Sequence, residues 1–328
     1  MEGRVTLTIR RALAPEDYPF FDYRRFSFSL GIAAAGRIWL SGSTAVRHEP
    51  PAGMVVKGDL VAQAAVIYDK MKATLSAAQR ELDDVVRMVR YVTPAVVKDL
   101  PALDRFESET FGRTLPVTTL VVHSLLRPEA LIEIEAIAYN GGADGLDYLQ
   151  SVVAPDRAAA WAKAAKELKA RGLDCTHVVK ASELATAVAF AGPALAGALA
   201  ALRVGMPRLA RAEEGVQIDI TVAPSAAPPV VFVSAEGDPA KEGIVNQCRD
   251  LYARLTEKLA QAGASPGSVV KTTEFIVPAA LRDYRGTADV RRDVFSTPYP
   301  AATGVICERL AASGALIAVE AAAMKGSG

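Results

Sequence analysis

One pattern occurs three times along the chain, and this repetition constrains the fold more than any other feature. Each copy is the end of an amphipathic helix, a short polar turn, two valines, a basic residue and a strand-like run. The three joints are VVR at 85–87, VVK at 178–180 and VVK at 269–271. Because self-similarity within one chain marks repeated structural units, we expect three related modules in the 328 residues.

Each joint is preceded by a helix with one apolar face. In the third helix this face consists of Ile244, Cys248, Leu251, Leu255 and Leu259. In the first helix Ile67, Met71 and Leu75 repeat the spacing after an N-cap at Asp59. Trp161 and Leu168 mark a shorter, alanine-rich version in the second.

Each joint is followed by another helical stretch, a proline and an alternating strand. Pro116 precedes LIEIEAIA, Pro207 precedes VQIDITVA and Pro300 precedes LIAVEAAA. Side chains alternate across a strand, so Ile132, Ile134, Ala136 and Ala138 share one face and Glu133, Glu135 and Ile137 share the other. An opening strand is predicted in the first repeat (37–43) and the third (230–236), and a lost or reduced hairpin in the second.

These elements predict an α+β fold in which each repeat is a β-sheet with two helices on one face. The predicted units are 1–140 (a complete repeat), 150–223 (a degenerate repeat) and 229–325 (the third repeat). Three open sheet faces in one chain can cover one another around an approximate threefold axis. We therefore expect an intrachain pseudo-trimer.

Composition excludes several classes of function. Basic and acidic residues balance at 37 each, so no overall charge attracts nucleic acid or anionic membranes. Three distant cysteines and three histidines disfavour a disulfide framework, a metal site or another cofactor. The N-terminus lacks an apolar signal region, and we predict a cytoplasmic protein. The uncharged run 184–202 is interpreted as a buried helix pair rather than a membrane span, because Gly192-Pro193 interrupts it.

At these motifs the chain resembles the RidA/YjgF family. The first repeat carries SGS (41–43), GDLVAQ (58–63), the two valines, the Pro116 turn and EIEAIA; the third carries SAE (234–236), Gln247, VVKTTEF (269–275), PAATGV (300–305) and VEAAA (319–323). The second repeat resembles the family faintly. Family members are homotrimers with clefts between subunits, so the resemblance implies a chain that imitates a trimer and works as a monomer or homodimer.

The resemblance also implies the site residues. The last glutamate of the terminal strand faces the family's cleft, which makes Glu135 and Glu320 the expected catalytic acid–base residues; Asp219 corresponds in the second repeat, with a slip of one residue. The expected substrate-binding residues are Phe28, Ser41, Gly42, Ser43, Arg90, Thr118, Ser234, Glu236, Thr303 and Cys307. Backbone groups at Ser41-Gly42 and Ser234-Ala235 are expected to hydrogen-bond a substrate.

Several residues depart from the family pattern. The family's clamp arginine, two residues after the proline, is replaced by Thr118 and Ala302, and its tyrosine by Phe28. Neither Thr nor Ala can replace a bidentate guanidinium, so ordinary imino acids are poor candidate substrates. Cys307 lacks a neighbouring histidine, which favours a buried structural thiol over a nucleophile.

A second set of residues follows from aligning the joints. Arg90, Glu183 and Glu274 each stand three residues after the basic position. Under threefold pseudo-symmetry they occupy equivalent places, and they either converge near the axis, line related clefts or are separate surface residues.

The function implied is that of a small-molecule hydrolase or deaminase of RidA type, acting on an imine, enamine or related C–N substrate in one cleft. Two alternatives stay open. One is a chorismatase-like enzyme that releases pyruvate from chorismate, and the other is a metabolite-binding protein without catalysis. Nucleic acid and membranes are not expected partners.

Overall fold

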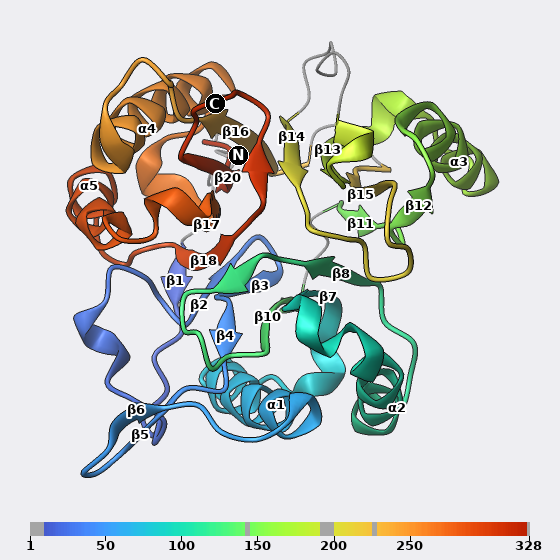
Figure 1. The fold of residues 1–328 in the computed structure, drawn as a ribbon. Helices are drawn as coiled ribbons and strands as arrows, with labels where there is room; N and C mark the ends of the chain where they lie inside the picture. The colour runs from blue at the N-terminus through green and yellow to red at the C-terminus, as the bar shows by residue number, and fades with distance from the viewer. Residues whose placement is uncertain (1–9, 142–144, 191–199, 225–227, 327–328) are drawn as a thin grey trace, which may run out of the picture.

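The computed structural model describes residues 10–141, 145–190, 200–224 and 228–326. Figure 1 shows three groups of helices on the periphery and three sheets that face a common centre. The α+β fold predicted from the sequence is confirmed, and the arrangement is consistent with the expected pseudo-trimer.

The elements of the three repeats follow one another along the chain. Repeat 1 contains β1 (Arg11–Ala12), β2 (Gly31–Ala34), β3 (Arg37–Leu40), β4 (Ser43–Thr44), β5 (Arg47–Glu49), β6 (Gly53–Val55), α1 (Leu60–Ser76), β7 (Val85–Val92), α2 (Leu100–Phe111), β8 (Val117–Val121), β9 (Ser124–Leu125) and β10 (Ile132–Tyr139). Repeat 2 contains β11 (Asp147–Tyr148), β12 (Val152–Ala154), α3 (Arg157–Ala170), β13 (Val178–Ala185), β14 (Ala200–Gly205) and β15 (Val216–Val222). Repeat 3 contains β16 (Val230–Glu236), α4 (Gly243–Gln261), β17 (Val269–Ile276), α5 (Thr287–Val294), β18 (Ala301–Ile306), β19 (Arg309–Leu310) and β20 (Ile317–Met324).

The three sheets share one strand order. Their central paths are β3-β10-β7-β8, β15-β13-β14 and β16-β20-β17-β18, with the last two strands of each path parallel. In repeat 2 the short strands β11 and β12 pair with β15 where repeats 1 and 3 have their opening strand. The degenerate middle repeat therefore keeps the topology of its neighbours, with its opening hairpin reduced as expected.

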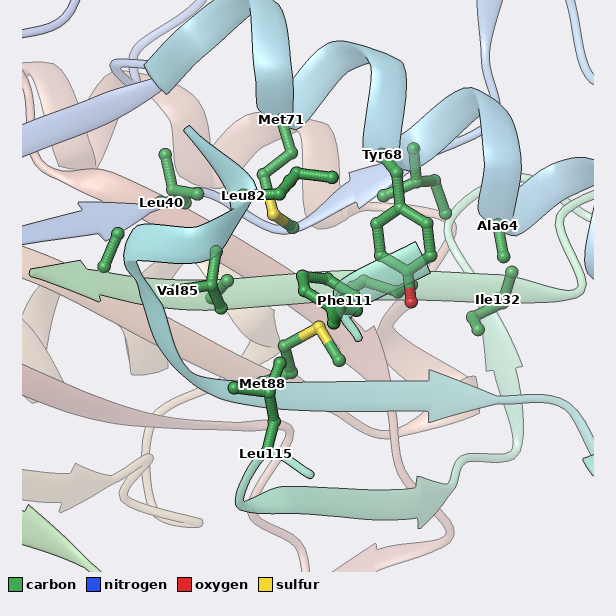
Figure 2. Close-up of a cluster of buried hydrophobic side chains, with 14 of the residues drawn as sticks. Leu40, Ala64, Tyr68, Met71, Leu82, Val85, Met88, Phe111, Leu115 and Ile132 are labelled. Atoms are coloured by element: carbon green, nitrogen blue, oxygen red, sulfur yellow. The ribbon is translucent and has the colours of Figure 1, made fainter. Parts of the chain in front are cut away.

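One face of each sheet packs on helices. In repeat 1, Figure 2 shows Tyr68 and Met71 of α1 reaching toward Val85, Met88 and Ile132 of the sheet. The predicted N-cap is confirmed, because the side chain of Asp59 accepts a hydrogen bond from the backbone N–H of Ala62. The predicted apolar face of α4 is confirmed too, since all five of its residues are buried.

The opposite faces of the three sheets pack on one another. One apolar cluster brings together Val89 of β7, Leu184 of β13 and Phe275 of β17, and a second brings together Trp39, Tyr148 and Val270. Strands also cross between repeats, because β9 extends the sheet of repeat 3 and β19 extends the sheet of repeat 2. The repeats therefore share a continuous apolar interior.

The interpretation of 184–202 as a helix pair is wrong for the described part of that run. Leu184 and Ala185 end β13, Val188–Phe190 is one 3-10 turn, and β14 begins at Ala200; residues 191–199 lie outside the described ranges. In its described part repeat 2 has a single α-helix, α3. No helix within the described ranges is long and apolar enough to cross a membrane. The unit boundaries 1–140, 150–223 and 229–325 stay a proposal.

Candidate active site

The basic residues of the three joints form a ring of ion pairs that links the repeats. Each lies on its sheet's inner face and pairs with an acidic residue on the terminal strand of another repeat. The pairs are Arg87–Asp219 (2.5 Å), Lys180–Glu320 (2.8 Å) and Lys271–Glu135 (2.8 Å). Repeat 1 thus bonds to repeat 2, repeat 2 to repeat 3, and repeat 3 back to repeat 1.

Strand register shows that the three acids are equivalent. Glu135, Asp219 and Glu320 lie opposite Val89, Ser182 and Thr273, which occupy the same position in the three sheets. The expected one-residue slip at Asp219 is absent, so that part of the alignment was wrong.

Each acid of the ring also accepts a hydroxyl hydrogen bond. Thr118 donates to Asp219 over 2.7 Å, and Thr303 donates to Glu135 over 2.5 Å. In repeat 2 the counterpart of these threonines is Leu202, which cannot donate, and Ser182 bonds Glu320 over 2.7 Å instead. Each ring acid is therefore held by one cation and one hydroxyl group.

Glu135 and Glu320 line a small cavity of about 50 Å³, and their predicted acid–base role stays a prediction. Burial would raise the pKa of Glu135, but the charge and hydrogen bond of Lys271, with the hydroxyl of Thr303, hold it below its ordinary value. Glu320 is likewise buried against Lys180. Both side chains join repeats and do not line the large clefts described next.

A cleft of about 820 Å³ lies between repeats 1 and 3, and we name it cleft A. Its walls come from the end of β3, β4, the start of β10, helix α1, strand β18 and helix α5. Five of the predicted substrate-binding residues line it: Phe28, Ser41, Gly42, Ser43 and Thr303.

Glu133 is one of three glutamates that line cleft A, with Glu129 and Glu274, and it stands two residues before the glutamate chosen from the sequence. Its side chain is 6% exposed, and an added Cβ on Gly42 would lie 2.1 Å from its Oε1. Burial, helped by the negative charge of Glu135, raises the pKa of Glu133 to about 8 against the opposing charges of Lys271 and Lys70. The alternation of side chains along the strand predicted that Glu133 shares a face with Glu135. The family resemblance favoured Glu135 as the catalytic residue.

Lys70 of α1 also lines cleft A and is not among the residues predicted from the sequence. Its side chain is 1% exposed, and its Nζ donates to the backbone carbonyls of Thr44 (2.7 Å) and Val46. Burial lowers the pKa of Lys70, the positive charges of Arg47 and Arg127 add to this effect and Glu133 opposes it; the resulting pKa is about 7.

The mouth of cleft A is apolar. Phe26 stacks on Phe28 with ring centroids 5.4 Å apart, and both rings line the cleft. Phe26, Leu126 and Leu281 are three of the four large apolar side chains that are exposed within the described ranges. Exposed apolar side chains gathered at one cleft favour a ligand with an apolar group.

The backbone amides of Ser41 and Gly42 bond protein groups, and their expected hydrogen bonds to a substrate stay a prediction. The amide of Ser41 donates to Leu30, and the amide of Gly42 donates to the carbonyl of Ala302 (3.0 Å) and to Thr303 Oγ1 (2.9 Å). The Ser41 hydroxyl also accepts from the Ala302 amide over 2.8 Å. These bonds fix the wall of cleft A across the boundary between repeats 1 and 3.

Gly42→Ala is expected to disturb cleft A, because the new methyl group would occupy the space of the Glu133 carboxylate and the Thr303 hydroxyl. We expect a loss of about 1–3 kcal/mol in the free energy of unfolding, typical of overpacking. Denaturant unfolding measures it. Gly267→Ala is the matched control, since the nearest atom to its added Cβ is 3.8 Å away; equal stability of both variants would contradict the close approach.

The corresponding cleft between repeats 1 and 2, cleft B, has a volume of about 570 Å³. Gln217 stands there at the position of Glu133, and Ala318 stands at that position in repeat 3. Of the three equivalent strand positions, one therefore carries a carboxylate. By strand register, Thr118 of repeat 1 occupies the same position as Thr303 of repeat 3, and Val117 the same position as Ala302. None of these four residues is the family's arginine.

Arg90, Glu183 and Glu274 occupy equivalent positions, as expected, but they do not converge near the axis. Each is paired within its own repeat: Arg90 with Glu107 (2.9 Å), Glu183 with Arg203 (2.9 Å) and Glu274 with Arg291 (2.9 Å). Arg90 lines cleft B and Glu274 lines cleft A, which agrees with the interpretation that they line related clefts. The paired Arg90 is thus absent from cleft A, where five of the predicted substrate-binding residues lie.

Three further predicted residues lie outside clefts A and B. Cys307 is fully buried in the shared apolar interior, and burial raises the pKa of its thiol to about 12, which supports the structural interpretation. Glu236 accepts a hydrogen bond from the Ala312 amide over 2.8 Å, and the Ser234 carbonyl accepts one from Lys258. Within the described ranges no group of three or more His, Cys, Asp or Glu could hold a metal ion.

The chain matches one protein family in two segments. The sequence model described as endoribonuclease L-PSP matches residues 24–140 and 224–325, which together exceed half of the chain. The chain belongs to this family, the RidA/YjgF family. A RutC family protein of Pyrococcus horikoshii is 33% identical over 113 residues, covering 34% of this chain and 86% of its own.

Two other relatives match a similar share of the chain. An uncharacterized protein of Streptomyces coelicolor is 29% identical over 120 residues, which cover 36% of this chain and 86% of its own. A solved structure of a protein of unknown function from Pseudomonas aeruginosa is 30% identical, with a TM-score of 0.34, and covers 40% of this chain and 94% of its own. The family match thus spans repeats 1 and 3, whose elements form cleft A.

Proposed function

We propose that this RidA/YjgF protein hydrolyses an imine or enamine in cleft A, with Glu133 as the group that donates and accepts protons. The observation that carries the proposal is the buried carboxyl of Glu133, which lines a large cleft and has a pKa of about 8. A general acid or base works best when its pKa lies near the operating pH. We further propose that the working unit is one chain or a homodimer in the cytoplasm.

The reaction consumes one water for each C=N bond. Protonated Glu133 gives its proton to the imine nitrogen, and the resulting carboxylate then accepts a proton from the water that attacks the carbon. Collapse of the intermediate leaves a carbonyl compound and ammonia, or an amine if the nitrogen was substituted. The buried setting of Glu133 supports this role, because water competes little for its proton.

The apolar mouth indicates the substrate class. Phe26, Phe28 and Leu281 offer an apolar wall, and the cations on the same cleft include Arg127, Arg285, Arg291 and Arg292. We therefore expect an imine with an aromatic or other large apolar substituent.

Ammonia release tests the proposal directly. An amino-acid oxidase generates the imines of phenylalanine and alanine in situ, and ammonia release is compared with and without the protein. We expect the protein to accelerate release from the aromatic imine more than from the small one. Acceleration should decline as the pH rises through about 8, where Glu133 loses its proton.

The same assay separates the alternatives. Saturable binding of the aromatic imine's keto product without any acceleration would favour a metabolite-binding protein, which the replacement of the clamp arginine at Ala302 also favours. Pyruvate release from chorismate, measured against a reaction without protein, would favour the chorismatase class.

A further inference from the structure

Lys70 is a buried amine in cleft A that the proposed hydrolysis does not use. It is one of two lysines that are buried within the described ranges, and the other, Lys271, has the carboxylate of Glu135 at 2.8 Å. The hydrogen-bond acceptors of Lys70 are two backbone carbonyls, at Thr44 and Val46. Among the residues that the structure describes, no carboxylate forms an ion pair with Lys70, in contrast to Lys271.

This geometry suits a neutral amine. A neutral amino group has two N–H donors and one lone pair, whereas an ammonium group has three donors. The carbonyls of Thr44 and Val46 accept the two N–H hydrogens of a neutral Lys70. The lone pair takes the remaining position on the nitrogen, and Lys70 itself lines cleft A. The rings of Phe20 and Phe21, with centroids 5.6 and 5.1 Å from Nζ, favour the charged form but accept no conventional hydrogen bond.

The charged groups around Lys70 act in both directions. Burial favours the neutral amine, as do Arg47 of β5 and Arg127 of the segment after β9, while Glu133 of β10 favours the ammonium form. At the resulting pKa of about 7, about half of the Lys70 amines are neutral at pH 7. An ordinary exposed lysine is neutral in about one molecule in a few thousand at that pH.

We propose that Lys70 is a covalent site for carbonyl compounds and imines that carry an apolar substituent. The Lys70 nitrogen attacks the carbon of a C=O or C=N group; loss of water or ammonia then leaves a C=N bond between Nζ and that carbon. The leaving oxygen or nitrogen takes two protons in total, which balance the two that the amine loses. Water then cleaves the adduct, restores the amine and releases the carbonyl compound.

Glu133 is placed to serve this step as well. Lys70 and Glu133 line the same cleft, and each affects the pKa of the other. The carboxyl can protonate the leaving group, and its carboxylate can take the proton from the attacking nitrogen. The inference extends the proposed function to a covalent route, but adduct formation with an aldehyde does not require that function.

Reductive trapping tests the inference. The protein is incubated with a small excess of benzaldehyde and borohydride at pH 7, and the benzylated lysines are located by peptide mass spectrometry. We expect Lys70 to be labelled at least tenfold faster than Lys72, an exposed lysine of the same helix that pairs with Asp69. The rate at Lys70 should rise with pH through about 7 and level off above it.

Variants and a second readout keep the result interpretable. Lys70→Met should abolish the fast label and Lys72→Met should keep it. Because trapping on the unmodified protein reports Lys70 directly, it remains decisive if Lys70→Met fails to fold. Labelling of Lys70 no faster than Lys72 would overturn the covalent site.

The covalent site and the proposed hydrolysis can fail separately. Fast labelling of Lys70 without ammonia release from any imine would support the covalent site and contradict the hydrolase. Ammonia release with a wild-type rate in Lys70→Arg, and no fast label in the unmodified protein, would support the hydrolase and contradict the covalent site.

Discussion

Glu133→Gln is expected to lower kcat for imine hydrolysis about 10²- to 10⁴-fold, the usual contribution of a positioned general acid or base. Glutamine keeps the size of the side chain, so the wall of Gly42 and Thr303 should stay in place, while the proton that the imine nitrogen needs is lost. The residual activity should no longer decline as the pH rises through about 8. Ammonia release across a pH series measures both effects.

Glu109→Gln, an exposed position on α2, is the matched control and should retain full activity.

The Glu133→Gln substitution should also change the pH dependence of stability. The pKa of Glu133 is raised in the folded state, so its contribution is complete below the unfolded value of about 4.3 and is lost as the pH rises through about 8. The glutamine variant should therefore resist unfolding better than the natural protein at pH 9, and an unchanged kcat would show that Glu133 is not the proton donor.

Arg87→Met is expected to lower the free energy of unfolding by about 3–5 kcal/mol, because it leaves the buried carboxylate of Asp219 without its cation. The double variant Arg87→Met, Asp219→Leu should recover most of this loss, since it removes the second charge as well. Denaturant unfolding at pH 7 measures all three proteins.

Lys57→Met is the matched control for the ring of ion pairs. Lys57 pairs with Glu49, but the Lys57 side chain is 68% exposed, and its loss should change the free energy of unfolding by less than about 1 kcal/mol.

Arg87 lowers the pKa of Asp219 in the folded state, although burial opposes this shift. The pair therefore stabilises the fold fully above the unfolded pKa of about 3.9, and this stabilisation is lost as the pH falls through the lower folded pKa. Equal stability losses for Arg87→Met and Lys57→Met would contradict a structural role for the ring.

Local patterns in the sequence predicted most of the fold. The alternation along 132–138 assigned the two faces correctly: Ile132, Ile134, Ala136 and Ala138 pack in the helix-side core. The repeated joint also contained the ring's basic residues, although their partners were not recognisable. Arg87 and Asp219 are 132 residues apart, and ordinary sequence periodicity carries no information about such a contact.

The site was harder to predict because it depends on which side chain reaches a boundary between repeats. Glu133 and Glu135 share a strand face, and a shift of two residues separates a cleft acid from a ring acid. Lys70 stands beside the apolar face of α1 and has the pattern of a solvated helix residue. Its burial comes from the backbone at Thr44 and Val46 and the rings of Phe20 and Phe21, none of which the helical spacing can indicate.

Covalent linkage of the repeats changes how such a site can evolve. In an assembly of three identical chains, any substitution appears at every subunit boundary simultaneously, so a gain at one is tied to the same change at the others. Here the positions equivalent to Glu133 hold Gln217 and Ala318, so the three boundaries carry different side chains at this position. A titration with the preferred ligand should accordingly reach saturation at one molecule per polypeptide.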